Sequence, residues 1–207
     1  MRLSHALFWL SPLLVVPVLA ADPAAPAPAL RETFDGPFSA DWNWELGTWT
    51  AKDGVLRGFE SGPRRHGPVK MRKFAFQNGT VEYEFRLEGK ATFSGIVFNG
   101  SQERGHLVHL VIARDMTRLI VHPPDKGAPV TLLSETNPIT PDAWHSVKVE
   151  INGPKITATI DGKAFSAESP IIGEEKLFLG LGGESGGPEG EKAGALEFRK
   201  LQATKAP

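Results

Sequence analysis

Cysteine is absent from the 207-residue sequence, and tyrosine occurs only once. Without thiols, the chain forms no disulfide bond and offers no thiolate to zinc or to an iron–sulfur cluster. An excess of positive charge is also lacking, because 23 Lys and Arg residues are balanced by 24 Asp and Glu residues. Since nucleic-acid-binding proteins usually carry a basic surface, we expect no nucleic-acid partner.

The first 20 residues have the pattern of a secretory signal peptide. Residues 1–2 carry the positive end, residues 7–19 are almost wholly apolar, and cleavage is expected near Ala20 or Ala21. The alternative is a membrane anchor, but an apolar run of about 13 residues is shorter than the roughly 20 that span a bilayer. We therefore expect a secreted or periplasmic protein with no membrane insertion after cleavage.

A Pro/Ala linker follows over residues 21–30, and we expect one folded domain over 31–202 and a C-terminal tail over 203–207. Short alternating or apolar runs recur through this domain, and no amphipathic helix is apparent. Turns are expected at Asp53-Gly54, Asn78-Gly79, Asn99-Gly100, Asn152-Gly153 and Asp161-Gly162.

The clearest strand pattern covers residues 144–165, where two alternating runs and a third short run are separated by such turns. Strands with one apolar face need a second sheet to cover that face. The predicted fold class is therefore all-β, a jelly-roll sandwich of two antiparallel sheets.

Acidic residues alternate along the strand predicted over residues 81–88. Val81, Tyr83, Phe85 and Leu87 would face the core, which leaves Glu82, Glu84, Arg86 and Glu88 on the other face. Same-face neighbours lie roughly 6.5–7 Å apart, within the range of carboxylate separations that hydrolyse glycosidic bonds. Glu82 and Glu84 are therefore candidate catalytic residues and Arg86 is a candidate substrate-binding residue. The alternative is a solvated strand face with interleaved charges.

Three of the five tryptophans, Trp42, Trp44 and Trp49, lie close together in the sequence. A tryptophan ring can stack on the apolar face of a sugar, and Trp49 is the candidate for this role. The alternative is that these rings fill the core, since Trp42 and Trp44 would share one strand face with Leu46. We expect at least two of the three in the core.

The histidines do not show a helical zinc-binding spacing, and no metal site is predicted. His106 and His109 are three residues apart and are expected on opposite faces of a strand. His109 would share a face with Leu107 and Val111, and it is a candidate catalytic residue or else a structural histidine.

Further candidates for substrate binding lie in loops. Residues 61–68 gather Arg64, Arg65 and His66 between glycines and prolines, either as a clamp for a carboxylate or hydroxyl-rich ligand or as an exposed connection. Asn99, at a predicted turn, completes the candidate substrate-binding set.

Several segments resemble the exported concanavalin A-like domains known as 3-keto-disaccharide hydrolases. They are Gly47-Thr48-Trp49 with residues 53–56, and residues 79–87, 94–98, 105–110 and 144–162. The resemblance spans nearly all of residues 34–201. It implies a concanavalin A-like jelly roll whose concave face accepts saccharides, in an exported bacterial protein. The family's pattern has an asparagine where this chain has Phe93, and an acid where it has Leu107, which argues that part of the catalytic apparatus is missing.

Two hypotheses follow. The first is a glycoside hydrolase or lyase in which Glu82 or Glu84 acts as acid or base, Arg86 and His109 polarise the substrate, and the 61–67 loop closes the site. The second is a non-catalytic glycan-binding or structural surface module. Either way, the expected partner is a saccharide or glycoconjugate. No cofactor is expected beyond a structural calcium, for which Asp35 or Asp161 would supply an oxygen.

Overall fold

The computed structural model describes residues 29–62, 66–187 and 189–206. The predicted signal peptide, most of the predicted linker, and Arg64 and Arg65 lie outside these ranges. In the described part of the chain, no helix has the length and apolar character needed to cross a membrane.

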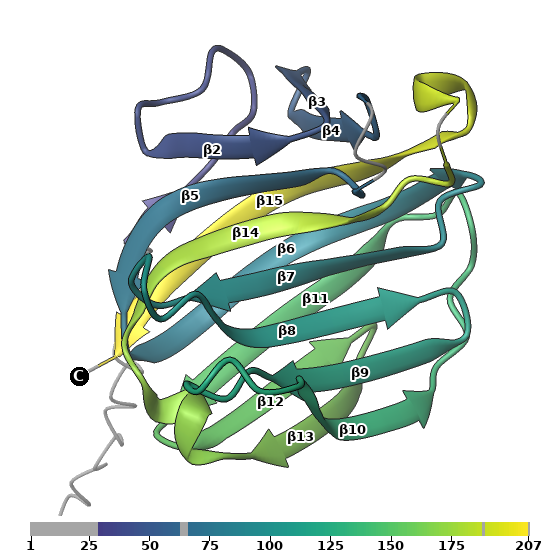
Figure 1. Ribbon diagram of the computed structural model, residues 1–207. Helices are drawn as coiled ribbons and strands as arrows, with labels where there is room; N and C mark the ends of the chain where they lie inside the picture. The colour runs from purple at the N-terminus through teal and green to yellow at the C-terminus, as the bar shows by residue number, and fades with distance from the viewer. Residues whose placement is uncertain (1–28, 63–65, 188, 207) are drawn as a thin grey trace, which may run out of the picture.

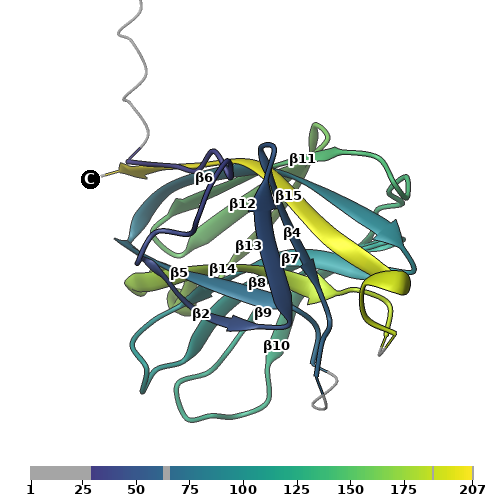
Figure 2. The ribbon, with the colours of Figure 1, turned by 90° about the horizontal axis from the view of Figure 1, so that it is seen from above.

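Two antiparallel sheets stack face to face in these ranges (Figures 1 and 2). Sheet A consists of β13 (Lys163–Glu168), β12 (Lys155–Ile160), β11 (His145–Asn152), β6 (Asn78–Gly89), β15 (Gly194–Ala206), β4 (Val55–Phe59) and β3 (Thr48–Lys52) in spatial order, with β1 (Leu30–Arg31) paired to β15. Sheet B consists of β10 (Val130–Thr136), β9 (Met116–Val121), β8 (His106–Ala113), β7 (Phe93–Asn99), β14 (Lys176–Glu184), β5 (Val69–Phe76) and β2 (Trp42–Leu46). Two short 3₁₀ turns, η1 (Pro170–Gly173) and η2 (Gly190–Lys192), connect strands. The predicted all-β sandwich is confirmed.

The period-two patterns place their residues as predicted in the central strands of sheet A. Val81, Tyr83, Phe85 and Leu87 of β6 are buried between the sheets. β11, β12 and β13 pair as consecutive antiparallel strands, and Asp161 and Gly162 form the second turn with φ of 46° and 85°. Both residues lie in the left-handed region that such a two-residue turn requires.

The end of β15 differs from the prediction. Gly79 pairs with Lys205 and Asn78 with Ala206, so residues 203–206 belong to sheet A and do not form a tail. The same pairing places Asn78 and Gly79 at the start of β6, where a turn was expected. A side chain at Gly79, where φ is 152°, would clash with the carbonyl oxygen of Thr204.

Candidate functional site

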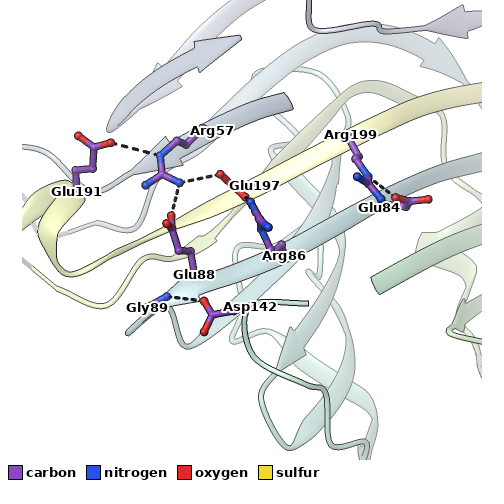
Figure 3. Close-up of polar contacts among 9 residues, drawn as sticks. All are labelled: Arg57, Glu84, Arg86, Glu88, Gly89, Asp142, Glu191, Glu197 and Arg199. Atoms are coloured by element: carbon purple, nitrogen blue, oxygen red, sulfur yellow. Dashed lines mark hydrogen bonds and ion pairs between the residues drawn. The ribbon is translucent and has the colours of Figure 1, made fainter. Parts of the chain in front are cut away.

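The outer face of sheet A carries charged residues on neighbouring strands, and these residues pair with one another. Arg57 of β4 contacts the carboxylates of Glu88 and Glu197, and Arg86 Nε donates to Glu197 Oε2 over 2.6 Å (Figure 3). Trp144 lies beside this network, with the guanidinium of Arg86 4.8 Å from its ring centre. Arg86 is therefore engaged within the protein.

The two candidate catalytic acids lie on this same face, as predicted, and both have partners. Glu84 accepts hydrogen bonds from Arg199 Nε at 2.5 Å and from Lys200 Nζ at 2.7 Å. Burial favours its neutral form, but these cations outweigh burial and lower the pKa of Glu84. Glu82 accepts a hydrogen bond from Gln202 at 2.5 Å. A carboxyl group with a lowered pKa is a poor proton donor at neutral pH, so this face is best explained as a network of paired charges.

The outer face of sheet B contains a groove of about 600 Å³. His66, Asn99 and His109, three of the predicted site residues, line it together with Trp44 and His106. Glu82, Glu84 and Arg86 lie on the outer face of the opposite sheet, so the predicted residues do not form one site. The division follows from strand pairing, because β6 belongs to sheet A whereas β7 and β8 belong to sheet B.

A β-bulge in β8 brings His106 and His109 to the same face, contrary to the prediction. Val108 pairs with Phe98 and His106 with Asn99, so Leu107 is an extra residue on the β8 side of the ladder. Both Leu107 and Val108 are fully buried, and the rings of His106 and His109 meet with their centres 4.7 Å apart. Leu107 therefore faces the core and does not share the face of His109.

A third imidazole completes a cluster that we call the histidine triad, made of His106, His109 and His122. The ring centre of His122, which follows β9, lies 4.6 Å from that of His109 and 5.2 Å from that of His106. The Nε2 atoms of His109 and His122 are buried and have no hydrogen-bond partner among the residues that the structure describes. Of these two residues, His109 lines the groove and His122 lies outside the described lining.

The histidine triad is electrically neutral at neutral pH. Burial, followed by the neighbouring imidazoles, lowers the pKa of His109 to about 3. Burial also lowers the pKa values of His106 and His122, with further contributions from His66 at His106, and from His106 and Arg104 at His122. Asn99 Oδ1 accepts a hydrogen bond from His106 Nδ1 at 2.8 Å, so Nε2 of His106 is the acceptor nitrogen of the neutral ring.

The Arg104 side chain is hydrogen-bonded to the backbone of two residues of the histidine triad. Its Nη1 and Nη2 donate to the carbonyl oxygens of His106 and His122 at 3.2 Å and 2.9 Å. Its Nε and Nη2 also form a bidentate pair with the carboxylate of Glu174 at 2.7 Å and 2.9 Å, which raises the pKa of Arg104. Arg104 is therefore a positioning residue for this face.

A second irregularity determines which tryptophan reaches the groove. The β2–β5 register shifts between Trp42 and Trp44, so Trp42 is buried, whereas Trp44 is 50% exposed and lines the groove. Trp49, the predicted sugar-binding ring, is buried near Phe198 and donates from Nε1 to the carbonyl oxygen of Leu46 at 2.8 Å. Two of the three tryptophans lie in the core as expected, but the exposed ring is Trp44.

Within the described ranges, the groove contains neither a carboxylate side chain nor a cluster of side chains that could hold a metal ion. Its described lining residues include no Asp or Glu. No three His, Asp or Glu side chains in these ranges are arranged to hold a metal ion. Asp161, a candidate calcium ligand, instead accepts hydrogen bonds from His145 Nδ1 at 2.6 Å and from the Ser146 amide at 2.8 Å.

Sequence reasoning missed Trp44, Arg104, His106 and His122 as residues of this face. One signal was available for His122, because a hairpin that turns at residues 114–115 sets position 120 opposite His109, and period two then places position 122 on the same face. No comparable signal exists for Trp44 or His106, since a bulge has no fixed sequence pattern.

Comparisons with known proteins agree with the fold. The model of a family described as the 3-keto-alpha-glucoside-1,2-lyase-like domain matches residues 29–203. A laminarinase from Flavobacterium sp. UMI-01 superposes with a TM-score of 0.65 at 15% identity, covering 86% of this chain and 100% of that one. Carbohydrate-binding module CBM66 from Bacillus subtilis superposes with a TM-score of 0.59 at 13% identity, covering 77% and 92%. A search of curated protein sequences found no match. At these identities, the structural likeness establishes a concanavalin A-like sandwich and no more.

Proposed function

Because the chain belongs to the family of 3-keto-alpha-glucoside-1,2-lyase-like domains, we propose that it is an exported protein that binds and cleaves a 3-keto-glycoside. The site is the groove on the outer face of sheet B, which we take as the concave saccharide-binding face. One observation carries this proposal: the exposed ring of Trp44 and the neutral imidazoles of His106 and His109 line the same groove. The N-terminal signal-peptide pattern supports export to the periplasm or the medium.

Trp44 is the residue we assign to sugar binding. Its half-exposed ring offers a flat apolar surface to one face of a pyranose, while Asn99 and His106 offer polar atoms at the side. Binding of this kind needs no charge on the sugar, in agreement with a groove whose described lining contains no Asp, Glu, Lys or Arg side chain.

His109 is the residue we assign to proton transfer. A ketone at C3 of the sugar acidifies the C2 hydrogen, which a neutral imidazole can remove. The electron pair left at C2 forms the C1=C2 double bond as the C1–O bond breaks, and the imidazolium returns its proton to the departing oxygen. The lowered pKa of His109 keeps the ring in its unprotonated form at neutral pH. The same shift makes the neutral ring a weaker base toward C2 and its imidazolium a stronger acid toward the departing oxygen.

Elimination suits this groove better than hydrolysis by paired carboxylates. That hydrolysis needs two acids on either side of the glycosidic bond. Glu82 and Glu84 lie on the opposite sheet, and both have internal partners.

The test is turnover of a synthetic 3-keto-glucoside, followed by NMR for the unsaturated sugar and the released alcohol. We expect the wild-type protein and Glu84→Gln to form both products, and His109→Asn to lose at least about 100-fold in rate, the usual contribution of a proton-transfer residue. Undiminished turnover by His109→Asn would contradict the assignment.

A second candidate function is non-catalytic glycan binding. It is favoured by the position of Leu107, which stands where the family pattern has an acid and is buried in the core. Calorimetric binding of the keto-glycoside without any product would select this function over the first.

A further inference from the structure

The groove continues into a second hollow of about 260 Å³, and the two share four residues, His66, Val69, Val97 and His109. The first half, which contains Trp44, also has polar side chains such as Asn43, Asn99 and Gln102. The second half is lined by apolar residues and glycines, and the shared histidines supply its only described polar side chains. The candidate proton-transfer residue thus lies where the first half, with its added polar side chains, meets a half whose other described side chains are apolar, which we call the apolar half.

An apolar outer face is unusual for a sheet whose inner face already packs against the core. Sheet A has charged residues on its corresponding face. In sheet B, Phe93, Val97 and Val111 point outward and are half-buried, and Gly95 adds no side chain to the floor between them. Apolar surface gathered in a hollow of this kind marks a binding site.

We propose that the apolar half binds the aglycone, and that the substrates are 3-keto-glycosides of aromatic alcohols in preference to keto-disaccharides. This inference rests on the proposed function. His109 must reach both C2 of the sugar and the oxygen that leaves from C1, so the sugar and the aglycone lie on either side of this residue. If the sugar stacks on Trp44, the aglycone occupies the apolar half.

The chemistry of the apolar half favours an aromatic ring over a second sugar. The hydroxyl groups of a second sugar would lose water there without finding partners, which is unfavourable. An aromatic ring would bury apolar surface instead. A cavity of about 150 Å³ holds benzene, so a hollow of about 260 Å³ has room for a single ring or a small bicyclic group.

The experiment compares benzyl, methyl and glucosyl 3-keto-glucosides of the same anomeric configuration. Benzyl alcohol and methanol are leaving groups of similar acidity, and a sugar hydroxyl is more acidic than either, so a higher kcat/KM for the benzyl glycoside reports binding of the aglycone. For the wild-type protein, we expect kcat/KM for the benzyl glycoside to exceed that for the disaccharide at least tenfold.

Val111→Asn places an amide in the apolar half and should lower the benzyl-to-methyl ratio of kcat/KM at least fivefold. Val130→Asn makes the same change at an exposed valine of β10, outside both hollows, and should leave the ratio unchanged. Thermal midpoints of both variants verify folding.

The outcomes separate the two proposals. Turnover without a preference for the benzyl glycoside, or a ratio that Val111→Asn does not change, overturns the aglycone assignment and leaves the proposed function in place. Tight calorimetric binding of the benzyl glycoside, weakened by Val111→Asn but without turnover of any compound, supports the aglycone site and overturns the proposed cleavage.

Discussion

The imidazole rings of His106 and His109 are in contact on the outer face of β8, although the two residues are three positions apart in one strand. The extra residue Leu107 makes this possible, because two consecutive side chains enter the core between them. The bulge therefore gathers polar groups at the point where they border an apolar surface, a common position for bulges at functional sites.

His109 should make the protein more stable as the pH rises from about 3 toward 6.5, the lowered and the ordinary pKa of this group. Within that window the unfolded chain binds a proton that the folded chain does not, so stability is lost as the pH falls. One histidine contributes a slope of up to about 1.4 kcal/mol per pH unit. Urea unfolding of the wild-type protein and of His109→Asn at several pH values measures the difference in slope. Equal slopes would contradict the prediction.

Trp44 and Trp49 offer a matched pair of substitutions. Trp44→Ala should change the free energy of unfolding by about 0.5 kcal/mol or less, because the ring is half exposed, and should weaken saccharide binding by about tenfold. Trp49→Ala removes a core ring and should cost about 3–5 kcal/mol of stability. Calorimetric titration and chemical denaturation measure both effects. Loss of binding in folded Trp49→Ala with intact binding in Trp44→Ala would reverse the assignment.

Glu84→Gln should keep enzymatic activity and lose about 1 kcal/mol or less of stability at neutral pH, because ion pairs at a partly exposed sheet surface contribute little. Since cationic partners lower the pKa of Glu84, its stabilisation is present above the ordinary carboxyl pKa and disappears as the pH falls through the lowered value. The two proteins should therefore become equally stable in acid. Loss of turnover in Glu84→Gln without a change in its thermal midpoint would contradict this prediction and would show that Glu84 is a catalytic residue.

Arg104→Lys keeps the positive charge but cannot reach Glu174 and the carbonyl oxygens of His106 and His122 together. We expect KM to rise about tenfold with a smaller change in kcat, because the triad is displaced but not removed. In histidine-selective NMR spectra, the ring signals of His106 and His122 should move, while that of His145 on sheet A should not. Unmoved triad signals would show that Arg104 does not position these rings.

Regular alternation made much of the fold predictable. Val81 to Leu87 and the strands around Asp161 follow period two without interruption, so their inner and outer faces were correct. Trp44 and His106 were misplaced because a bulge depends on how the partner strand is registered, which a single strand's sequence does not contain.

The site was harder to predict for a similar reason. The sequence placed Glu84 and His109 on outward faces, but whether two outward faces belong to the same sheet depends on pairing between distant strands. Glu84 lies on the outer face of sheet A and His109 on the outer face of sheet B, so each residue was assigned correctly to an outward face but the two do not form one site.

The position of β15 has a consequence for biogenesis. This strand lies between β6 and β4 in sheet A and also pairs with β1, where Leu30 meets Ala203. Sheet A therefore has a gap between β6 and β4 until β15 has been synthesised, and until then the facing edges of these two strands are unpaired. Pairing between strands so far apart in the sequence favours slow folding. During that time, the unpaired strand edges would be open to pairing with other chains unless a chaperone covers them.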